Sequence, residues 1–203
     1  MVIGGLYFLY STAQHIARTL NAPLLMQRYS RLVIDCNRPP EAPDAIPEAS
    51  HGTEVPANKS LTSDQRGLRV DEIFAPYDNA LTGLVEAQGR THAFSIHSFT
   101  PSLYGQPRPW DLGLLHRHDT RTSAALKRFF DESFPELTIG LNQPYQVDDE
   151  SDWFVQRHAE RLELNHSLIE IRNDLIRTAA AQERFATIIA QGIRHIASNG
   201  NTP

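Results

Sequence analysis

Short apolar runs that alternate with amphipathic segments are the feature that most constrains the fold of this chain. Each run has the length and composition of a β-strand. The intervening segments carry apolar residues at three- and four-residue steps, the periodicity of a helix with one buried face. This alternation predicts an α/β protein, a three-layer αβα sandwich in which helices cover both faces of a mixed sheet. The predicted strands are residues 24–26, 32–35, 93–97, 137–141 and 168–171, and the predicted helices are residues 13–20, 62–85, a segment that begins at Asp119, and residues 185–196.

Two segments interrupt this regular pattern. Residues 39–56 contain five prolines among acidic and small residues, and proline removes a backbone donor and fixes the local chain direction. We therefore expect a surface loop or lid there. The helix predicted over residues 62–85 contains Pro76, so we expect it to be bent or broken near that residue.

Length and composition limit the class of protein. The 203 residues fit a single domain, 1–203, and the formal net charge of -5 argues against a nucleic-acid surface. Cys36 is the only cysteine, so no intramolecular disulfide can form and a cytoplasmic location is the default expectation. The apolar opening MVIGGLYFLYSTAQ lacks the basic flank of a signal peptide and is too short to span a bilayer. We expect it to begin a buried helix or strand, and we expect no membrane partner.

Polar clusters follow or end four of the apolar runs. Asp35–Arg38 follow the second run, His97 and Ser98 end the third, Asn142 follows the fourth, and residues 170–173 end the last. Ligand sites in open α/β sheets gather at the carboxyl ends of the strands. The sequence therefore predicts a functional site at this edge of the sheet.

His97 and Glu170 are the candidates for chemistry at that edge. His97 could present a neutral imidazole to a metal or a proton to a substrate, and a hydrogen-bonded structural histidine is the alternative. Glu170 lies between Ile169 and Ile171, so strand alternation directs it to the opposite face. Desolvation would raise its pKa toward that of a general base, whereas a structural ion pair with Arg172 is an equally good explanation.

Arginine side chains could anchor an acidic substrate, because a guanidinium binds a carboxylate through two parallel hydrogen bonds. Arg38, beside Asn37, follows an apolar run, and a salt bridge to Asp35 or to the acidic loop that follows is its structural alternative. Arg108 lies in a proline-rich loop and could either bind a substrate carboxylate or form a structural salt bridge. Cys36 has no adjacent base, so we interpret it as a packing residue rather than a nucleophile.

Several ordered segments together resemble the N-formylglutamate amidohydrolase family. They are APLLMQRYSRLVIDCNRPP, EVPANKSL, IFAPYDNAL, SIHSFTPSLYGQPRPWDLGLL, IGLNQPY and LIEIRNDLI, and the resemblance is strongest over residues 13–176. It implies a phosphorylase/hydrolase-like αβα fold, related to the zinc carboxypeptidases. It also implies a zinc-dependent reaction that releases formate from N-formyl-L-glutamate, so the expected partner is a small N-acyl amino acid.

The same resemblance assigns roles to single residues. His97 of SIHSF would be a zinc ligand, and Glu170 of IEIRND would be the acid/base that takes a proton from the zinc-bound water and passes it to the leaving amine. Asn37 and Arg38 of DCNRP would face the substrate carboxylate. The remaining candidates for substrate binding are Arg108, Asn142 and Arg172.

The resemblance leaves a gap at the start of the chain. Relatives usually begin with a segment carrying EHASN and then HxAWDxG, where the other metal ligands are expected. This chain opens at MVIGGLYFLYSTAQH, with IGG as the remnant of the second segment and Val2 at the family's aspartate. Either the natural protein begins earlier, or this is a diverged member that keeps an acidic-ligand pocket and has lost the metal. His15 or His158 could replace a missing ligand. A lost strand would expose apolar surface, which predicts poor solubility or a homo-oligomer.

Overall fold

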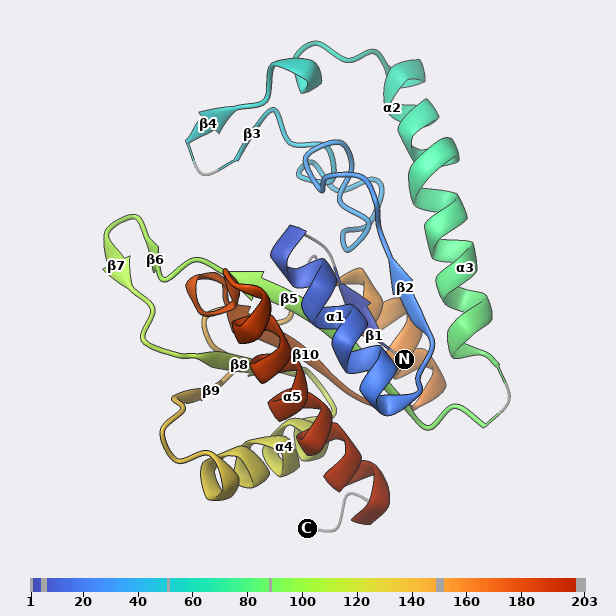
Figure 1. Cartoon of the computed structure of the whole chain (residues 1–203). Coiled ribbons are helices and arrows are strands. Elements are labelled where there is room, and N and C mark those ends of the chain that lie inside the picture. The colour runs from blue at the N-terminus through green and yellow to red at the C-terminus, as the bar shows by residue number, and fades with distance from the viewer. Residues whose placement is uncertain (1, 5–6, 51, 88, 149–151, 200–203) are drawn as a thin grey trace.

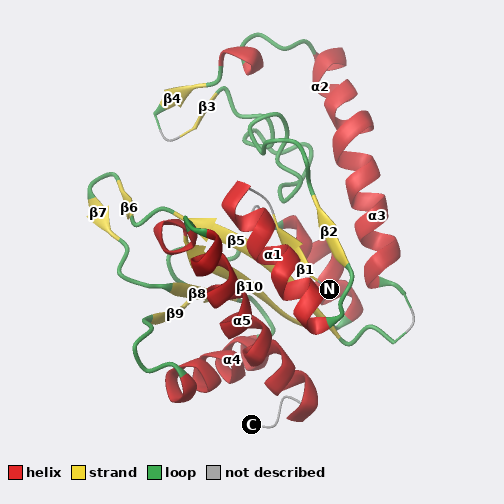
Figure 2. Cartoon of the chain, viewed as in Figure 1, coloured by secondary structure: helices red, strands yellow, loops and turns green. Residues whose placement is uncertain are grey.

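The structure is a computed structural model that describes residues 2–4, 7–50, 52–87, 89–148 and 152–199. A six-stranded sheet lies at its centre with helices on both faces (Figures 1 and 2). The strands of this sheet are β1 (Val2–Gly4), β2 (Leu24–Met26), β5 (His92–Phe99), β8 (Leu112–Leu115), β9 (Ile139–Leu141) and β10 (Asn165–Arg172). Two small hairpins are formed by β3 (Ala49–Ser50) with β4 (Thr53–Glu54), and by β6 (Ser102–Leu103) with β7 (Gln106–Pro107).

The sheet is mixed. Its strand order is β2-β1-β5-β10-β8-β9. The first four strands in this order run parallel, β8 runs antiparallel to β10, and β9 runs parallel to β8. The α/β class that the alternating pattern predicts is therefore confirmed.

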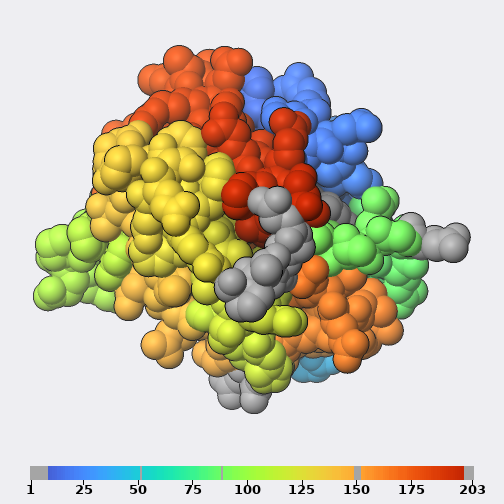
Figure 3. Space-filling view, turned by 90° about the horizontal axis from the view of Figure 1, so that it is seen from below, coloured from blue at the N-terminus to red at the C-terminus, as the bar shows by residue number. Residues whose placement is uncertain are grey.

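Three helices cover one face of the sheet. They are α1 (Tyr7–Leu20), α4 (Thr120–Ser133) and α5 (Ala179–Asn199), and α1 and α5 cross in front of the strands in Figure 1. Figure 3 shows α4 and α5 side by side on the outside of this layer. Phe94 and Ile96 of β5 and Ile169 and Ile171 of β10 pack under these helices in the main hydrophobic core. This face of the sheet is closed by apolar packing.

The other face carries one long interrupted helix and a short one. The long helix consists of α2 (Ser63–Arg69), the π-helical turn η2 (Val70–Phe74) and α3 (Ala75–Val85), and the short one is η3 (Val155–Ala159). Pro76 lies in the first turn of α3, directly after the π-helical turn. The expected interruption near Pro76 is thus present, because proline cannot donate to the preceding turn and the wider turn accommodates its ring.

The remaining short helical turns are η1 (Pro56–Asn58), η4 (Glu160–Leu162) and η5 (Asn173–Ile176). Thr62 caps α2 with a complete capping box, and Asp119 caps α4 through the Thr122 amide. Both helix starts therefore agree with the sequence, in which a Thr or Asp precedes the periodic segment.

One predicted strand is wrong, and within the central sheet β8 was not predicted. Residues 31–33 form a turn rather than part of a strand, and the amide of Asp35 donates to the carbonyl of Ala45 in the following loop. Ile34 is fully buried against η2 and α3, so its apolar character reflects tertiary packing rather than a strand. β8 is a fully buried run of four residues that is not among the predicted strands.

The start of the chain contributes an internal strand. β1 lies between β2 and β5, and α1 follows it. Gly5, part of the predicted IGG remnant, lies outside the described residues. Among the described helices, none combines the length and the apolar character that a membrane crossing requires.

Candidate active site

A cleft of about 1110 Å³ opens on the face of the sheet that α3 covers. Its walls come from the loop of residues 27–38, from α3, from the carboxyl-terminal halves of β5 and β10, and from residues 145–154 where they are described. Four of the predicted site residues line it: Asn37, Arg38, His97 and Glu170. Its volume is in the upper range for sites that bind small molecules.

His97 and Glu170 are direct neighbours across two parallel strands. They occupy the same register position of β5 and β10, and both line the cleft. On the far side of β10, Glu170 is opposite Gly113 of β8. A Cβ atom at Gly113 would lie 1.9 Å from the carbonyl oxygen of Gln143 and 3.3 Å from the Cβ of Glu170. The absent side chain therefore allows the loop after β9 to close against β8, the strand next to the one that carries Glu170.

Glu170 is a buried carboxyl group that forms no ion pair with another described residue. The residue is 6% exposed, and its Oε2 atom is buried and has no hydrogen-bond partner among the described residues. Burial, reinforced by the negative charge of Asp152, raises the pKa of Glu170 to about 8, although Arg31 and Arg108 oppose the shift. Glu170 is thus mostly protonated at neutral pH and titrates just above it, in the range suited to a general acid or base.

His97 is neutral and held in a fixed orientation. Its Nε2 atom lies 2.8 Å from the hydroxyl oxygen of Ser95, two residues earlier on the same face of β5. Burial lowers the pKa of His97 to about 4, against the opposing effect of Asp35. The bond to Ser95 leaves Nδ1 as the nitrogen available to a ligand.

Asn37 fastens two walls of the cleft to each other. Its side-chain nitrogen donates to Asp152 at 2.8 Å, its side-chain oxygen accepts from the amide of Phe154 at 3.1 Å, and its carbonyl oxygen accepts from the amide of Trp153. Asn37 therefore positions Asp152 near Glu170. Its expected contact with a substrate carboxylate stays a prediction.

The arginines of the 27–38 loop differ in how they are engaged. Arg31 pairs with Asp35 at 2.6 Å, and Arg38 pairs with Asp44 at 3.3 Å. Arg38 thus faces the cleft but has an acidic partner in the proline-rich loop. A salt bridge to this loop is one of the two structural alternatives for Arg38. Arg28 is exposed at the rim.

Asn142 and Arg172 are not among the residues that line the cleft. Arg172 pairs with Asp111 at 3.2 Å and with Asp174 at 2.8 Å, so the alternative in which it neutralises Glu170 is wrong. The side-chain oxygen of Asn142 accepts from the amide of His116 at 2.9 Å and shapes the loop after β9. Substrate binding by either residue stays a prediction.

Arg108 lies behind the wall of the cleft. It is 8% exposed, and its Nη1 atom donates to the hydroxyl oxygen of Tyr145 at 2.8 Å. The Tyr145 ring stacks over the guanidinium with 4.7 Å between Cζ and the ring centroid. Tyr145 itself lines the cleft. Arg108 therefore reaches the site through Tyr145.

A catalytic zinc normally keeps three protein ligands. Across the described ranges no three His, Cys, Asp or Glu side chains are grouped closely enough to share an ion. His158 does not supply the missing ligand, because it is fully buried and its Nε2 atom lies 2.8 Å from Asp78 of α3. The residues described here thus do not fit a three-ligand zinc site.

Cys36 is a packing residue in this arrangement. It is buried in a small cluster with Ile34, Ile46 and Phe74, and its sulfur accepts a hydrogen bond from Gln27 at 3.2 Å. Burial raises the pKa of the thiol to about 11, so the nucleophilic thiolate is scarce at neutral pH.

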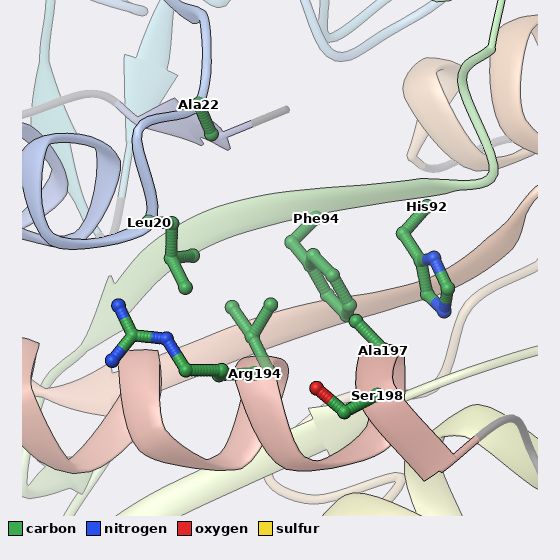
Figure 4. A pocket seen from close by; sticks show the side chains of 8 residues that line it. Leu20, Ala22, His92, Phe94, Arg194, Ala197 and Ser198 are labelled. Carbon is green, nitrogen blue, oxygen red and sulfur yellow. The ribbon is translucent and has the colours of Figure 1, made fainter.

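A second, smaller pocket lies at the opposite end of β5. Its volume is about 270 Å³, and Figure 4 shows His92, Phe94 and Leu20 lining it together with residues of α5. Its arginine, Arg194, donates to the carbonyl oxygen of Thr19 at 2.6 Å. This pocket is separate from the cleft that holds Glu170.

Sequence reasoning did not identify Ser95, Tyr145 or Asp152 as site residues. Strand alternation could have found Ser95, because it lies on the same face of β5 as His97. Tyr145 belongs to the segment IGLNQPY, which marks its loop but not its contact with Arg108. Asp152 gave no signal, because its bond to Asn37 is a contact between residues far apart in the sequence.

Solved structures share this fold over nearly the whole chain. A gene product of Agrobacterium tumefaciens is 28% identical, with a TM-score of 0.89, and the match covers 98% of this chain and 90% of that one. An N-formylglutamate amidohydrolase from Ralstonia eutropha JMP134 is 20% identical, with a TM-score of 0.60 and coverage of 96% and 93%. An N-acetylmuramoyl-L-alanine amidase of Nostoc punctiforme is 10% identical, with a TM-score of 0.52 and coverage of 97% of each chain. None of the curated proteins that were compared matches the chain.

Fold and family together define a hydrolase that cleaves amides on a mixed α/β scaffold. The more specific assignment comes from the sequence, because the family model for N-formylglutamate amidohydrolase matches residues 10–177. The chain belongs to the N-formylglutamate amidohydrolase family.

Proposed function

We propose that this protein hydrolyses the amide bond of a small N-formyl or N-acyl amino acid, with Glu170 as the acid/base. The observation that carries the proposal is the buried Glu170 carboxyl group, whose Oε2 atom has no partner among the described residues and which lines a large cleft in a member of this family. A buried carboxyl group without a partner destabilises the fold, so its position in a cleft favours a functional role.

The chemistry assigned to Glu170 follows from its raised pKa. Its ionised fraction takes a proton from the attacking water as oxygen bonds to the acyl carbon. The protonated carboxyl group then gives that proton to the leaving nitrogen as the carbon–nitrogen bond breaks, which releases formate, or another carboxylate, and the free amino acid. A group with a pKa of about 8 can hold and release a proton near neutral pH, so both transfers are accessible to one residue.

The substrate class rests on the charge of the cleft and on the family. Arg28, Arg31 and Arg38 lie along its rim, which suits an acidic amino acid, and N-formyl-L-glutamate is the first candidate. Zinc dependence, with His97 as a ligand through Nδ1, stays a prediction, since the described residues supply too few ligands for it. Imidazole ligands alone do not select zinc over cobalt or iron.

The test is release of formate from N-formyl-L-glutamate, measured alongside N-acetyl-L-glutamate with and without added zinc. The wild-type protein should release the carboxylate, and Glu170→Gln should reduce kcat by roughly 100-fold or more, since acid/base catalysis typically contributes 100- to 10,000-fold. Arg194→Met, in the separate pocket, is the matched control and should leave kcat within about twofold. The proposal fails if no N-acyl amino acid is hydrolysed under either metal condition, or if Glu170→Gln is as active as the wild type.

A second candidate function is a binding protein that has kept the cleft and lost the reaction. The incomplete zinc donor set among the described residues favours it. Binding of N-formyl-L-glutamate without formate release would support this alternative. Elemental analysis that finds one zinc per chain, lost in His97→Ala, would instead favour the metal-dependent hydrolase.

A further inference from the structure

Arg108 is a buried cation that pairs with no carboxylate of the described residues. At 8% exposure it is the most buried arginine of the described chain, and its contacts are with Thr100 at 3.5 Å and Tyr145 at 2.8 Å. No ion pair between described residues includes it, whereas Arg31, Arg38 and Arg172 each have a carboxylate partner. A buried charge is costly unless it is paired. An anion is therefore the complement that this position lacks.

Tyr145 connects this cation to the cleft. Its hydroxyl oxygen accepts the hydrogen bond from Arg108, so the hydroxyl hydrogen must point elsewhere, and no described residue accepts it. The Tyr145 side chain is 38% exposed and lines the cleft, while its ring covers the guanidinium. A hydroxyl that accepts from a cation is polarised and becomes a stronger donor to an anion.

The backbone around both residues is fixed. The amide of Arg108 donates to the carbonyl oxygen of Pro101 at 2.8 Å, at the base of the β6–β7 hairpin. The loop that carries Tyr145 is held by Asn142, which accepts from His116, and by the close approach of Gln143 to Gly113. Tyr145 and Glu170 line the same cleft.

We propose that Arg108 and Tyr145 form the carboxylate-binding unit of the cleft: Tyr145 donates its hydroxyl hydrogen to a ligand carboxylate, and Arg108 supplies the positive charge behind it. This rests on the proposed function in that the ligand is an acidic N-acyl amino acid. In this assignment Tyr145 determines specificity and Arg108 is a positioning residue. Arg38 has a secondary role, because an acidic group already neutralises it.

The same charge could be supplied by the exposed arginines, and one of them provides the control. Arg28 also lines the cleft, and no ion pair between described residues includes it. It is solvent-exposed, however, so water already stabilises its charge and a ligand gains little from it. If general positive charge attracts the ligand, Arg28 and Arg108 should matter equally.

The experiment measures binding by calorimetry in a Glu170→Gln background, so that turnover does not interfere. The probes are N-formyl-L-glutamate and its uncharged diamide. Tyr145→Phe keeps the ring over the guanidinium and removes only the hydroxyl. It should weaken binding of the acid by roughly tenfold and of the diamide by less than about twofold, as expected for a hydrogen bond to a charged group.

Arg108→Met should weaken binding of the acid by at least about tenfold, and Arg28→Met by less than about threefold. The assignment is overturned if Tyr145→Phe weakens both probes equally, if Arg28→Met matches Tyr145→Phe, or if the unsubstituted background binds the acid no better than the diamide. None of these outcomes depends on Arg108→Met, so a folding defect in that variant does not affect the test. The wild type could release no formate while the background protein still binds the acid more tightly than the diamide. That result would contradict the proposed function but would still support the carboxylate-binding unit.

Discussion

The two faces of the central sheet are built from the same strands but differ in what they bury. Under α1, α4 and α5, residues Phe94, Ile96, Ile169 and Ile171 form a continuous apolar layer. On the opposite face, the intervening residues Ser95, His97 and Glu170 line an open cleft. Strand alternation thus places stabilising and destabilising groups one residue apart.

The apolar face of the sheet stabilises the fold, whereas the buried groups that form the cleft destabilise it. The apolar face buries side chains with no polar groups left to satisfy. The cleft face buries a carboxyl oxygen without a partner and a neutral imidazole, both of which lose hydration that the unfolded chain would have. Substitutions at neighbouring positions of β10 should therefore change stability in opposite directions.

Replacing Ile169 by Ala should give the largest effect. Ile169 is fully buried between the sheet and the helices, so the loss of its side chain leaves a cavity and should cost about 2 to 5 kcal/mol of unfolding free energy. Urea denaturation monitored by circular dichroism measures this loss. A cost below about 1 kcal/mol would show that the helices repack, and the contrast between the two faces would then be weaker than the structure indicates.

Replacing Glu170 by Gln should have the opposite sign. Burial raises the pKa of Glu170 from 4.5 to about 8, so between these values the folded protein holds a proton that the unfolded chain has released. The contribution of Glu170 to stability therefore falls as the pH rises through this window, by at most about 1.4 kcal/mol per pH unit. Glutamine does not titrate, so the metal-free variant should be about 1 to 3 kcal/mol more stable than the wild type at pH 8.

The control for this prediction is the same pair of proteins at pH 4.5, where Glu170 is protonated in the folded wild type and already half protonated in the unfolded chain, so the difference in stability should narrow. Denaturation curves at a series of pH values give the comparison directly. A stability difference that does not change with pH would mean that Glu170 is not held protonated by burial. Stabilisation together with loss of turnover would show that the site is maintained at a cost to the fold.

The sequence was sufficient for the architecture because the periodic signals are local. Alternation in LIEIRND correctly places Glu170 on the face opposite Ile169 and Ile171, and Asp119 correctly predicts the start of α4. The strand predicted at residues 32–35 fails because burial of Ile34 comes from helices more than thirty residues away along the chain, which no local pattern shows. The missed β8 is too short for its apolar residues to show a period.

Less of the site could be predicted, because its geometry depends on long-range contacts. The sequence identifies His97 and Glu170 as candidates, and the sheet register brings them together. It cannot show that Arg172 is occupied by Asp111, or that Asn37 holds Asp152 across 115 positions of the chain. The pairing of Arg108 with Tyr145 is likewise a tertiary contact, and it changes which arginine is available to a ligand.

Cys36 provides the smallest and most local test of the cleft face. Burial raises its pKa to about 11, so at pH 8 only about one thiol in a thousand is ionised, against roughly one in four for an ordinary cysteine with a pKa near 8.5. Iodoacetamide should therefore label the native protein at least about 100-fold more slowly than the urea-unfolded chain. Because the chain has a single cysteine, mass spectrometry reports this site alone. If the native protein is labelled within about tenfold of the unfolded rate, the 27–38 loop opens readily. Turnover by Cys36→Ala would then show whether the thiol itself has any role in the reaction.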